Sequence, residues 1–94
     1  MMIVGVQGTN SFNNYNTFIR AMAVALSDLK PEDKEFNIYA AGPGNINMMA
    51  MEFANLTERG MKARGMSIKF VKVEPDWLEE NVKKFFKEIR LNGK

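Results

Sequence analysis

The chain has 94 residues, of which 46% are apolar and 26% charged, and its mean hydropathy is −0.27. This length and composition predict one globular domain and exclude a disordered or collagen-like chain. Cysteine and histidine are both absent. Their absence excludes disulfides, Cys or His metal sites, Ser-His-Asp triads and Cys-His dyads.

The sequence has no apolar run of about 18 residues and no basic segment before a hydrophobic stretch, so we expect neither a membrane span nor a signal peptide. We therefore expect a cytoplasmic protein that does not act at a membrane. The net charge of +2 conceals an uneven distribution: residues 1–58 carry three Lys/Arg against six Asp/Glu, and residues 59–94 carry ten against five. The last third of the chain is basic.

Short apolar runs and helical periodicities alternate along the first two thirds of the chain. Residues 2–6 predict a buried strand, and residues 15–29 predict a helix because their apolar side chains recur every three or four positions. Residues 36–40 predict a second strand, and a glycine-bearing loop then leads into a second helix. This helix starts near Ile46 and ends at one of two glycines, and we favour an end at Arg64. The N-cap of the first helix is expected among three residues, Ser11, Asn13 and Asn14.

The last third of the chain predicts a strand and then a helix. Residues 67–73 form the strand, and their interleaved lysines indicate a wet face or a sheet edge. Pro75 ends this strand, and Asp76 with Glu79 resembles a capping box. The final helix is predicted from one apolar stripe, which comprises Leu78, Val82, Phe85, Phe86 and Ile89.

The element order predicts an α/β protein: a small Rossmann-like βαβαβα domain over residues 1–94, in two or three layers, with a parallel three-stranded sheet. Two strand orders stay open. A linear 1-2-3 order places the first two helices on one face of the sheet, whereas a 2-1-3 order places them on opposite faces. In both orders the loops after the first two strands lie at the carboxyl edge, where open α/β sheets bind ligands.

These two loops are the candidate ligand site. Glycine lets a ligand approach the backbone, hydroxyl and backbone N–H groups before a helix suit phosphate, and asparagine amides can bond a sugar or base. The alternative is that both loops are ordinary strand-to-helix turns with glycine and a cap. Neither loop has the GxGxxG or Walker A spacing. The candidate residues are Gly8, Thr9, Asn10 and Ser11 in the first loop, and Gly42, Pro43, Gly44, Asn45 and Asn47 in the second.

The first loop and its continuation, GTNSFNNY at residues 8–15, resemble the first motif of the YspA-like (YAcAr) group of the SLOG superfamily, which is Gly-Ser-Arg-Asp-Phe, two residues and Tyr. The segment AGPGNIN at residues 41–47 is similar to that group's Gly-Gly-Ala-x-Gly-x-Asp motif, and Pro75-Asp76-Trp77 is similar to a third landmark. The resemblance covers roughly residues 2–78 and implies a Rossmann-like domain that binds a nucleotide or nucleotide-derived ligand.

The chain departs from the family pattern at three positions: Asn10 replaces the arginine, Ala41 a glycine and Asn47 the acidic residue. It also lacks the Pro-Gly-Gly-x-Gly-Thr loop and nearby glutamate of the phosphoribohydrolase branch. Glu52 is the only carboxylate near the second loop, and a solvated helix position explains it. Without an acid/base pair or a metal site we predict no catalytic residues, name no cofactor, and expect sensing or sequestration instead of turnover.

Two further features indicate partners. A basic group, comprising Lys83, Lys84, Lys87 and Arg90, could hold nucleic acid, or could be the solvated face of the last helix. The DNA-processing protein of bacterial competence shares the superfamily fold and binds single strands, and this analogy alone keeps nucleic acid open as an alternative. Met48 and Met51 lie off the apolar stripe of the second helix and indicate a homo-oligomer, or else irregular core filling. Nucleotide binding is thus the leading prediction. The alternative is a small phage- or plasmid-type protein that acts on a host protein or nucleic acid through its basic, Met-rich surface.

Overall fold

The computed structural model describes residues 1–93 and contains four strands, three α-helices and one short 3₁₀ helix. The strands are β1 (Met2–Gly8), β2 (Glu35–Ala40), β3 (Ser67–Lys72) and β4 (Lys87–Leu91). The helices are α1 (Tyr15–Leu26), α2 (Gly44–Ala63), α3 (Pro75–Glu80) and the 3₁₀ helix η1 (Val82–Lys84). The α/β class and the Rossmann-like arrangement are confirmed.

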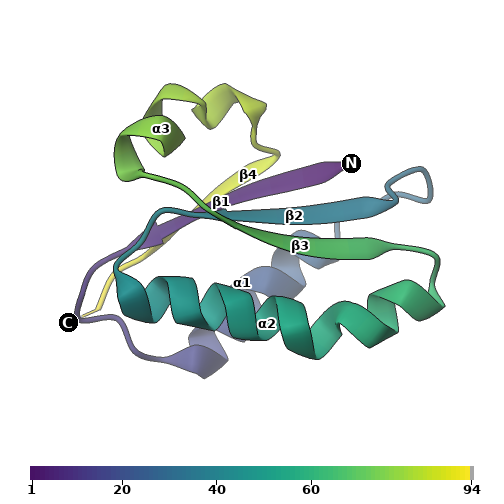
Figure 1. Cartoon of the computed structure of the whole chain (residues 1–94), viewed down its shortest axis with the longest axis horizontal. Coiled ribbons are helices and arrows are strands. Elements are labelled where there is room, and N and C mark those ends of the chain that lie inside the picture. The colour runs from purple at the N-terminus through teal and green to yellow at the C-terminus, as the bar shows by residue number, and fades with distance from the viewer. Residues whose placement is uncertain (94) are drawn as a thin grey trace.

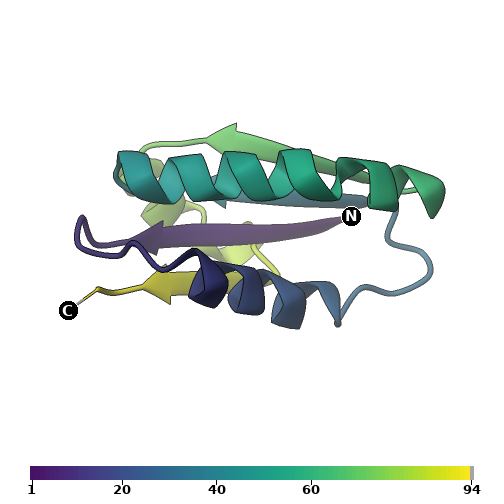
Figure 2. The same cartoon turned by 90° about the horizontal axis from the view of Figure 1, so that it is seen from below.

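All strands of the sheet are parallel, in the order β3-β2-β1-β4. The first three strands follow the linear order, and α1 and α2 accordingly cover the same face (Figures 1 and 2). The connection from β3 to β4 crosses the opposite face and carries α3 and η1 (Figure 1). The prediction of three strands is wrong by one, because β4 pairs with β1 along the side that β2 leaves free.

The predicted final helix is also corrected. α3 ends at Glu80, and the chain resumes as a strand at Lys87. Phe86 belongs to the apolar stripe of the predicted helix and is expected to be buried, but its side chain is 55% exposed. Phe85 instead packs under α3, where its ring lies near the rings of Tyr39 and Trp77.

The main core lies between the sheet and the layer of α1 and α2. Alternate residues of the strands point into it, and Val4, Val6 and Ile38 are fully buried there. From the helices Phe18 and Ile46 reach the same core with no exposed surface. Burial of this apolar face is what holds the two helices on the sheet.

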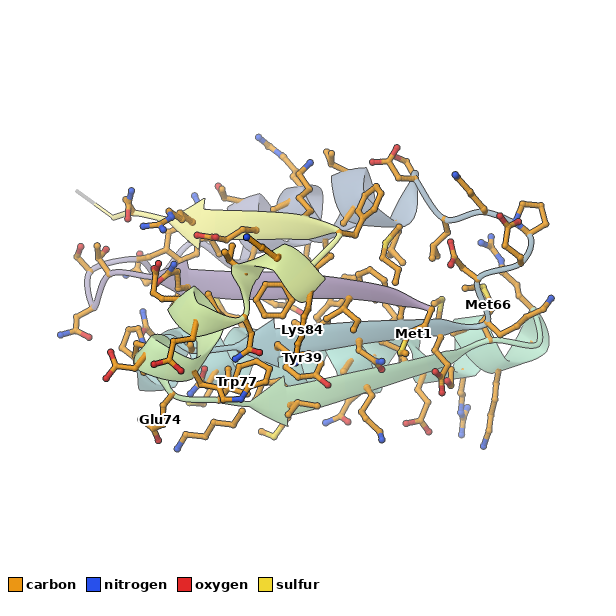
Figure 3. All side chains as sticks on the ribbon, turned by 90° about the horizontal axis from the view of Figure 1, so that it is seen from above. Met1, Tyr39, Met66, Glu74, Trp77 and Lys84 are labelled. Carbon is orange, nitrogen blue, oxygen red and sulfur yellow. The ribbon has the colours of Figure 1, made fainter. Side chains whose placement is uncertain are left out.

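The opposite face of the sheet is covered by the short helix α3. Leu78 of α3 is fully buried, and the Trp77 ring stacks on Tyr39 at 5.5 Å between centroids (Figure 3). Because α3 has only six residues, its cover is short and Trp77 remains 36% exposed.

α2 ends one residue before the position we favoured. Gly65 has a φ of +74°, a left-handed conformation that glycine adopts without steric penalty. Its N–H donates to the carbonyl of Lys62, and the N–H of Met66 donates to that of Met61, both at 2.9 Å. This is a Schellman end, which explains why the helix passes Gly60 and stops before Gly65. No helix within residues 1–93 is long and apolar enough to cross a membrane.

Candidate functional site

An open hollow of about 590 Å³ lies between the segment after β1, the start of α1 and the residues that follow β4. Its position has a topological meaning. After β1 the chain passes to the face that α1 covers, whereas the connection into β4 runs over the opposite face (Figure 1). The strand order reverses between β1 and β4, and the carboxyl edge at such a switch point is where open α/β sheets bind their ligands. The hollow is lined by Ser11, Phe12, Asn13, Asn14, Thr17, Asn92 and Gly93.

The first loop is tied to the end of β4 by its backbone. The N–H of Thr9 donates to the carbonyl of Leu91 at 3.0 Å, and the N–H of Gly93 donates to the Thr9 hydroxyl at 2.8 Å. Gly8 lies so close to β4 that a Cβ atom there would be 2.2 Å from the Leu91 carbonyl oxygen. Gly8 and Thr9 therefore hold together the carboxyl ends of β1 and β4, just before the segments that line the hollow.

Ser11 is the one residue of our predicted set that lines the hollow. Its side chain is exposed, and its Oγ lies 3.1 Å from the Oγ1 of Thr9. Because each hydroxyl can donate and accept, Ser11 keeps hydrogen-bonding capacity for a ligand. Asn10 is exposed at the tip of the same loop.

Of the second predicted loop, Gly42 and Pro43 precede α2, whereas Gly44, Asn45 and Asn47 belong to its first turn. This segment braces the first loop instead of lining the hollow. The Asn45 amide nitrogen donates to the carbonyl of Phe12 and, at 3.4 Å, to the carbonyl of Asn10. The Asn47 Oδ1 accepts from the N–H of Gly42 at 3.3 Å, closing its own loop. The two predicted loops thus meet, as expected, but through protein–protein hydrogen bonds.

The glycines of the second loop differ in what surrounds them. A Cβ on Gly42 would be 2.5 Å from the Cβ of Ile46, so this glycine is needed for close packing of the loop on its own helix. A Cβ on Gly44 would have no atom within 4 Å. Pro43 occupies the N-cap of α2 and forms no side-chain cap hydrogen bond.

Most of the residues that line the hollow are absent from the site that the sequence predicts. Asn14 was a candidate N-cap, and this role is confirmed because its Oδ1 accepts from the Thr17 N–H at 3.1 Å. Asn92 and Gly93 follow β4, which was not predicted as a strand. An Asn-Gly pair after an apolar, alternating segment is a turn signal that would have indicated a strand end there.

Within residues 1–93 the hollow is lined by no ionisable side chain, and its polar groups there are hydroxyls and amides. The amino terminus of α1 adds backbone N–H groups, and its first turn contains no acidic residue. Amides and hydroxyls can donate or accept, and a helix amino terminus favours negative charge. This environment suits an uncharged polar group such as a sugar or base, with an anionic group at the start of α1.

Tyr15, the first residue of α1, carries the one buried side-chain polar atom without a hydrogen-bond partner in residues 1–93. Burial of the hydroxyl, and then the charge of Glu52, raise the pKa of this phenol above its ordinary value. Its ring stacks on Phe18 at 6.2 Å between centroids. The hydroxyl itself therefore opposes folding, while the ring supports it.

We expect Tyr15→Phe to stabilise the protein by about 1 kcal/mol, because the ring stays and an unsatisfied buried hydroxyl is removed. Urea unfolding followed by circular dichroism would measure the change. Tyr39→Phe is a control on the other face of the sheet, since its hydroxyl is not among the unsatisfied buried atoms. A loss of stability in Tyr15→Phe would contradict this account.

The basic residues of the last third of the chain do not share one helix. Lys83 and Lys84 belong to η1, whereas Lys87 and Arg90 belong to β4. The Arg90 guanidinium is bonded to the Glu88 carboxylate at 2.7 Å and to the Glu79 carboxylate at 3.2 Å. The charge of Arg90 is thus compensated by these two carboxylates, which reduces the positive potential available for nucleic acid.

Comparison of the chain with protein-family models, with curated proteins and with solved structures found no match. The resemblance to the SLOG superfamily accordingly stays a prediction.

Proposed function

We propose that the protein binds a nucleotide or a nucleotide-derived small ligand in the hollow between β1, β4 and the start of α1, and acts as a non-catalytic sensor or sequestering protein. The observation that carries the proposal is the place of this hollow, at the switch point of a parallel sheet. Its volume of about 590 Å³ is in the range of small-molecule sites.

The chemistry of the lining supports this ligand class. Three asparagine amides, those of Asn13, Asn14 and Asn92, offer donor and acceptor atoms that match the edges of bases and the hydroxyls of a sugar. The Asn14 Oδ1 is already used as the N-cap, so its amide nitrogen is the atom that remains for a ligand. A phosphate would bind at the start of α1, where the N–H groups of the first turn are oriented outward along the helix axis.

Binding without turnover is supported by the described part of the lining, residues 11–14, Thr17 and residues 92–93, in which no side chain is ionisable. A general acid or base must lie within hydrogen-bond reach of the reacting atoms. The described lining residues offer neutral hydroxyls and amides for that role. We therefore propose recognition of the ligand and assign no reaction to the site.

The proposal is tested by native mass spectrometry and calorimetry with a panel of mono-, di- and cyclic nucleotides. We expect at least one to bind, and Thr17→Trp to weaken its affinity tenfold or more by filling the hollow. Asn16→Trp is the matched control, since Asn16 is exposed in the same helical turn but does not line the hollow. Its affinity should stay within about twofold of the wild type, because exposed substitutions have small effects.

Two results would contradict the proposal. One is the absence of binding by every nucleotide at millimolar concentration. The other is loss of binding in Gly44→Trp with normal binding in Thr17→Trp, which would assign the ligand to the second loop. Gly44 is suited to this comparison because its surroundings leave room for a side chain.

The alternative function, an interaction with a host protein or nucleic acid, is supported by the exposure of Met48 and Met51, at 66% and 47%. However, the basic residues Lys83 and Lys84 lie in η1, on the face of the sheet opposite to α2 (Figure 1). One partner surface therefore cannot contain both features. Charge reversal at Lys83 and Lys84 should abolish partner binding only if this alternative is correct.

A further inference from the structure

The outward face of α2 has an unusual composition for a solvated helix. Met48, Met51 and Leu56 are 66%, 47% and 68% exposed, and they lie within nine residues of one another along the helix. With a helical repeat of 3.6 residues, Met48 lies at the centre of the outward face, and Met51 and Leu56 lie on its two flanks. Isolated apolar residues are common on protein surfaces, whereas a group of this kind indicates a partner.

Three exposed charged residues, Glu52, Arg59 and Lys62, share this outward face. Glu52 and Arg59 are both exposed and are seven positions apart, so they lie almost on one line along the helix, about 10 Å apart. Neither forms an ion pair within residues 1–93. The face thus has a negative group, Glu52, on one side of its midpoint near residues 55 and 56, and two positive groups, Arg59 and Lys62, on the other.

The charges on the outward face of α2 are self-complementary. When two copies of α2 pack antiparallel about a twofold axis at residues 55–56, Glu52 of each copy lies opposite Arg59 of the other. Met48 then meets Ala63 of the second copy, and Leu56 lies beside the axis next to its own counterpart. A twofold interface requires such reciprocal contacts, in which residue i meets j and j meets i. Parallel packing in register would instead place like charges together.

We propose that the protein forms a homodimer through the outward face of α2, with its helices antiparallel and two Glu52–Arg59 ion pairs across the axis. The partner is a second copy of this chain, because the same face supplies both the apolar groups and the complementary charges. The hollow proposed as the ligand site lies at the switch-point edge of the sheet and shares no residue with this face. Dimerisation and ligand binding can therefore be tested independently, and failure of one proposal leaves the other intact.

The experiment is a charge-swap cycle followed by sedimentation equilibrium of the full chain. Glu52→Arg and Arg59→Glu should each raise the dimer dissociation constant about tenfold, because each creates two like-charge contacts. The double variant should return to within about threefold of the wild type. Glu32→Arg is the charge-matched control, because Glu32 is exposed between α1 and β2, outside α2, and it should leave the constant nearly unchanged.

Leu56→Lys tests the apolar part of the interface. Since Leu56 is 68% exposed in the single chain, its replacement should leave the circular dichroism spectrum intact while the protein becomes monomeric. A wild-type protein that stays monomeric at several hundred micromolar would overturn the proposal. A dimer that the double charge swap fails to restore would overturn the antiparallel pairing.

Discussion

Gly8→Ala is expected to destabilise the protein by about 3 kcal/mol, at the upper end of the range for overpacking. The added Cβ would lie 2.2 Å from the Leu91 carbonyl oxygen and 3.0 Å from the Cδ1 of Ile46. A side-chain atom can move aside, but the Leu91 oxygen belongs to a strand backbone. That oxygen also accepts the N–H of Thr9, so relief of the clash would separate β1 from β4 at the hollow.

Urea unfolding of Gly8→Ala and of Gly44→Ala would measure this effect. The Gly44 variant is the matched control, because its Cβ has no atom within 4 Å and alanine favours a helix. We expect it to be as stable as the wild type or slightly more stable. Equal stability of the two variants would contradict the close approach of β1 and β4 at Gly8.

Phe18→Ala is expected to cost about 3 to 5 kcal/mol, the range for a buried phenylalanine. Phe18 is completely buried between α1, α2 and the sheet, and its ring lies 6.2 Å from that of Tyr15 and 6.1 Å from that of Phe53. Its removal leaves a cavity at the junction of all three. Because domains of this size have only about 5 to 15 kcal/mol of stability, much of the total would be lost.

Phe86→Ala is the comparison for this prediction. The Phe86 side chain is 55% exposed, and we expect its truncation to cost about 1 kcal/mol or less. Calorimetric unfolding of both variants measures the contrast. Similar losses in the two variants would mean that Phe86 is buried in the protein in solution, as the sequence pattern first indicated.

The first 73 residues show what periodicity can predict. Strands β1 to β3 and helices α1 and α2 were each expected near their observed bounds, because each has a single repeat of apolar residues. The sharp end of α2 follows from Gly65, whose left-handed φ gives a local stop signal. These features depend on neighbours in sequence, which is why sequence alone suffices for them.

Residues 78–91 show where periodicity is ambiguous. Leu78, Phe85 and Ile89 fit a helical stripe at spacings of seven and four, but Ile89 and Leu91 also alternate with Glu88 and Arg90 as in a strand. The strand forms because β1 offers a free edge to it, with Val6 opposite Ile89. This choice depends on a tertiary contact that no local pattern contains.

The sequence predicted only part of the candidate site, because the hollow depends on β4. The sequence predicted that the loops after β1 and β2 share one edge of the sheet, and they do meet through Asn45. It could not show that Gly8 faces β4, since β4 itself was not predicted. The hollow lies beside that strand, so only Ser11 of the predicted residues lines it.

The central place of β1 has a consequence for the folding reaction. Its pairing with β2 needs only the closure of the α1 segment, whereas its pairing with β4 joins Val4 to Lys87, near opposite ends of the chain. Contacts between such distant residues are slow to form, because the entropy of loop closure is lost before the contact is gained. We expect a transition state in which β1, β2 and α1 are ordered while β4 is not, so that truncations in β4 accelerate unfolding and leave the folding rate almost unchanged.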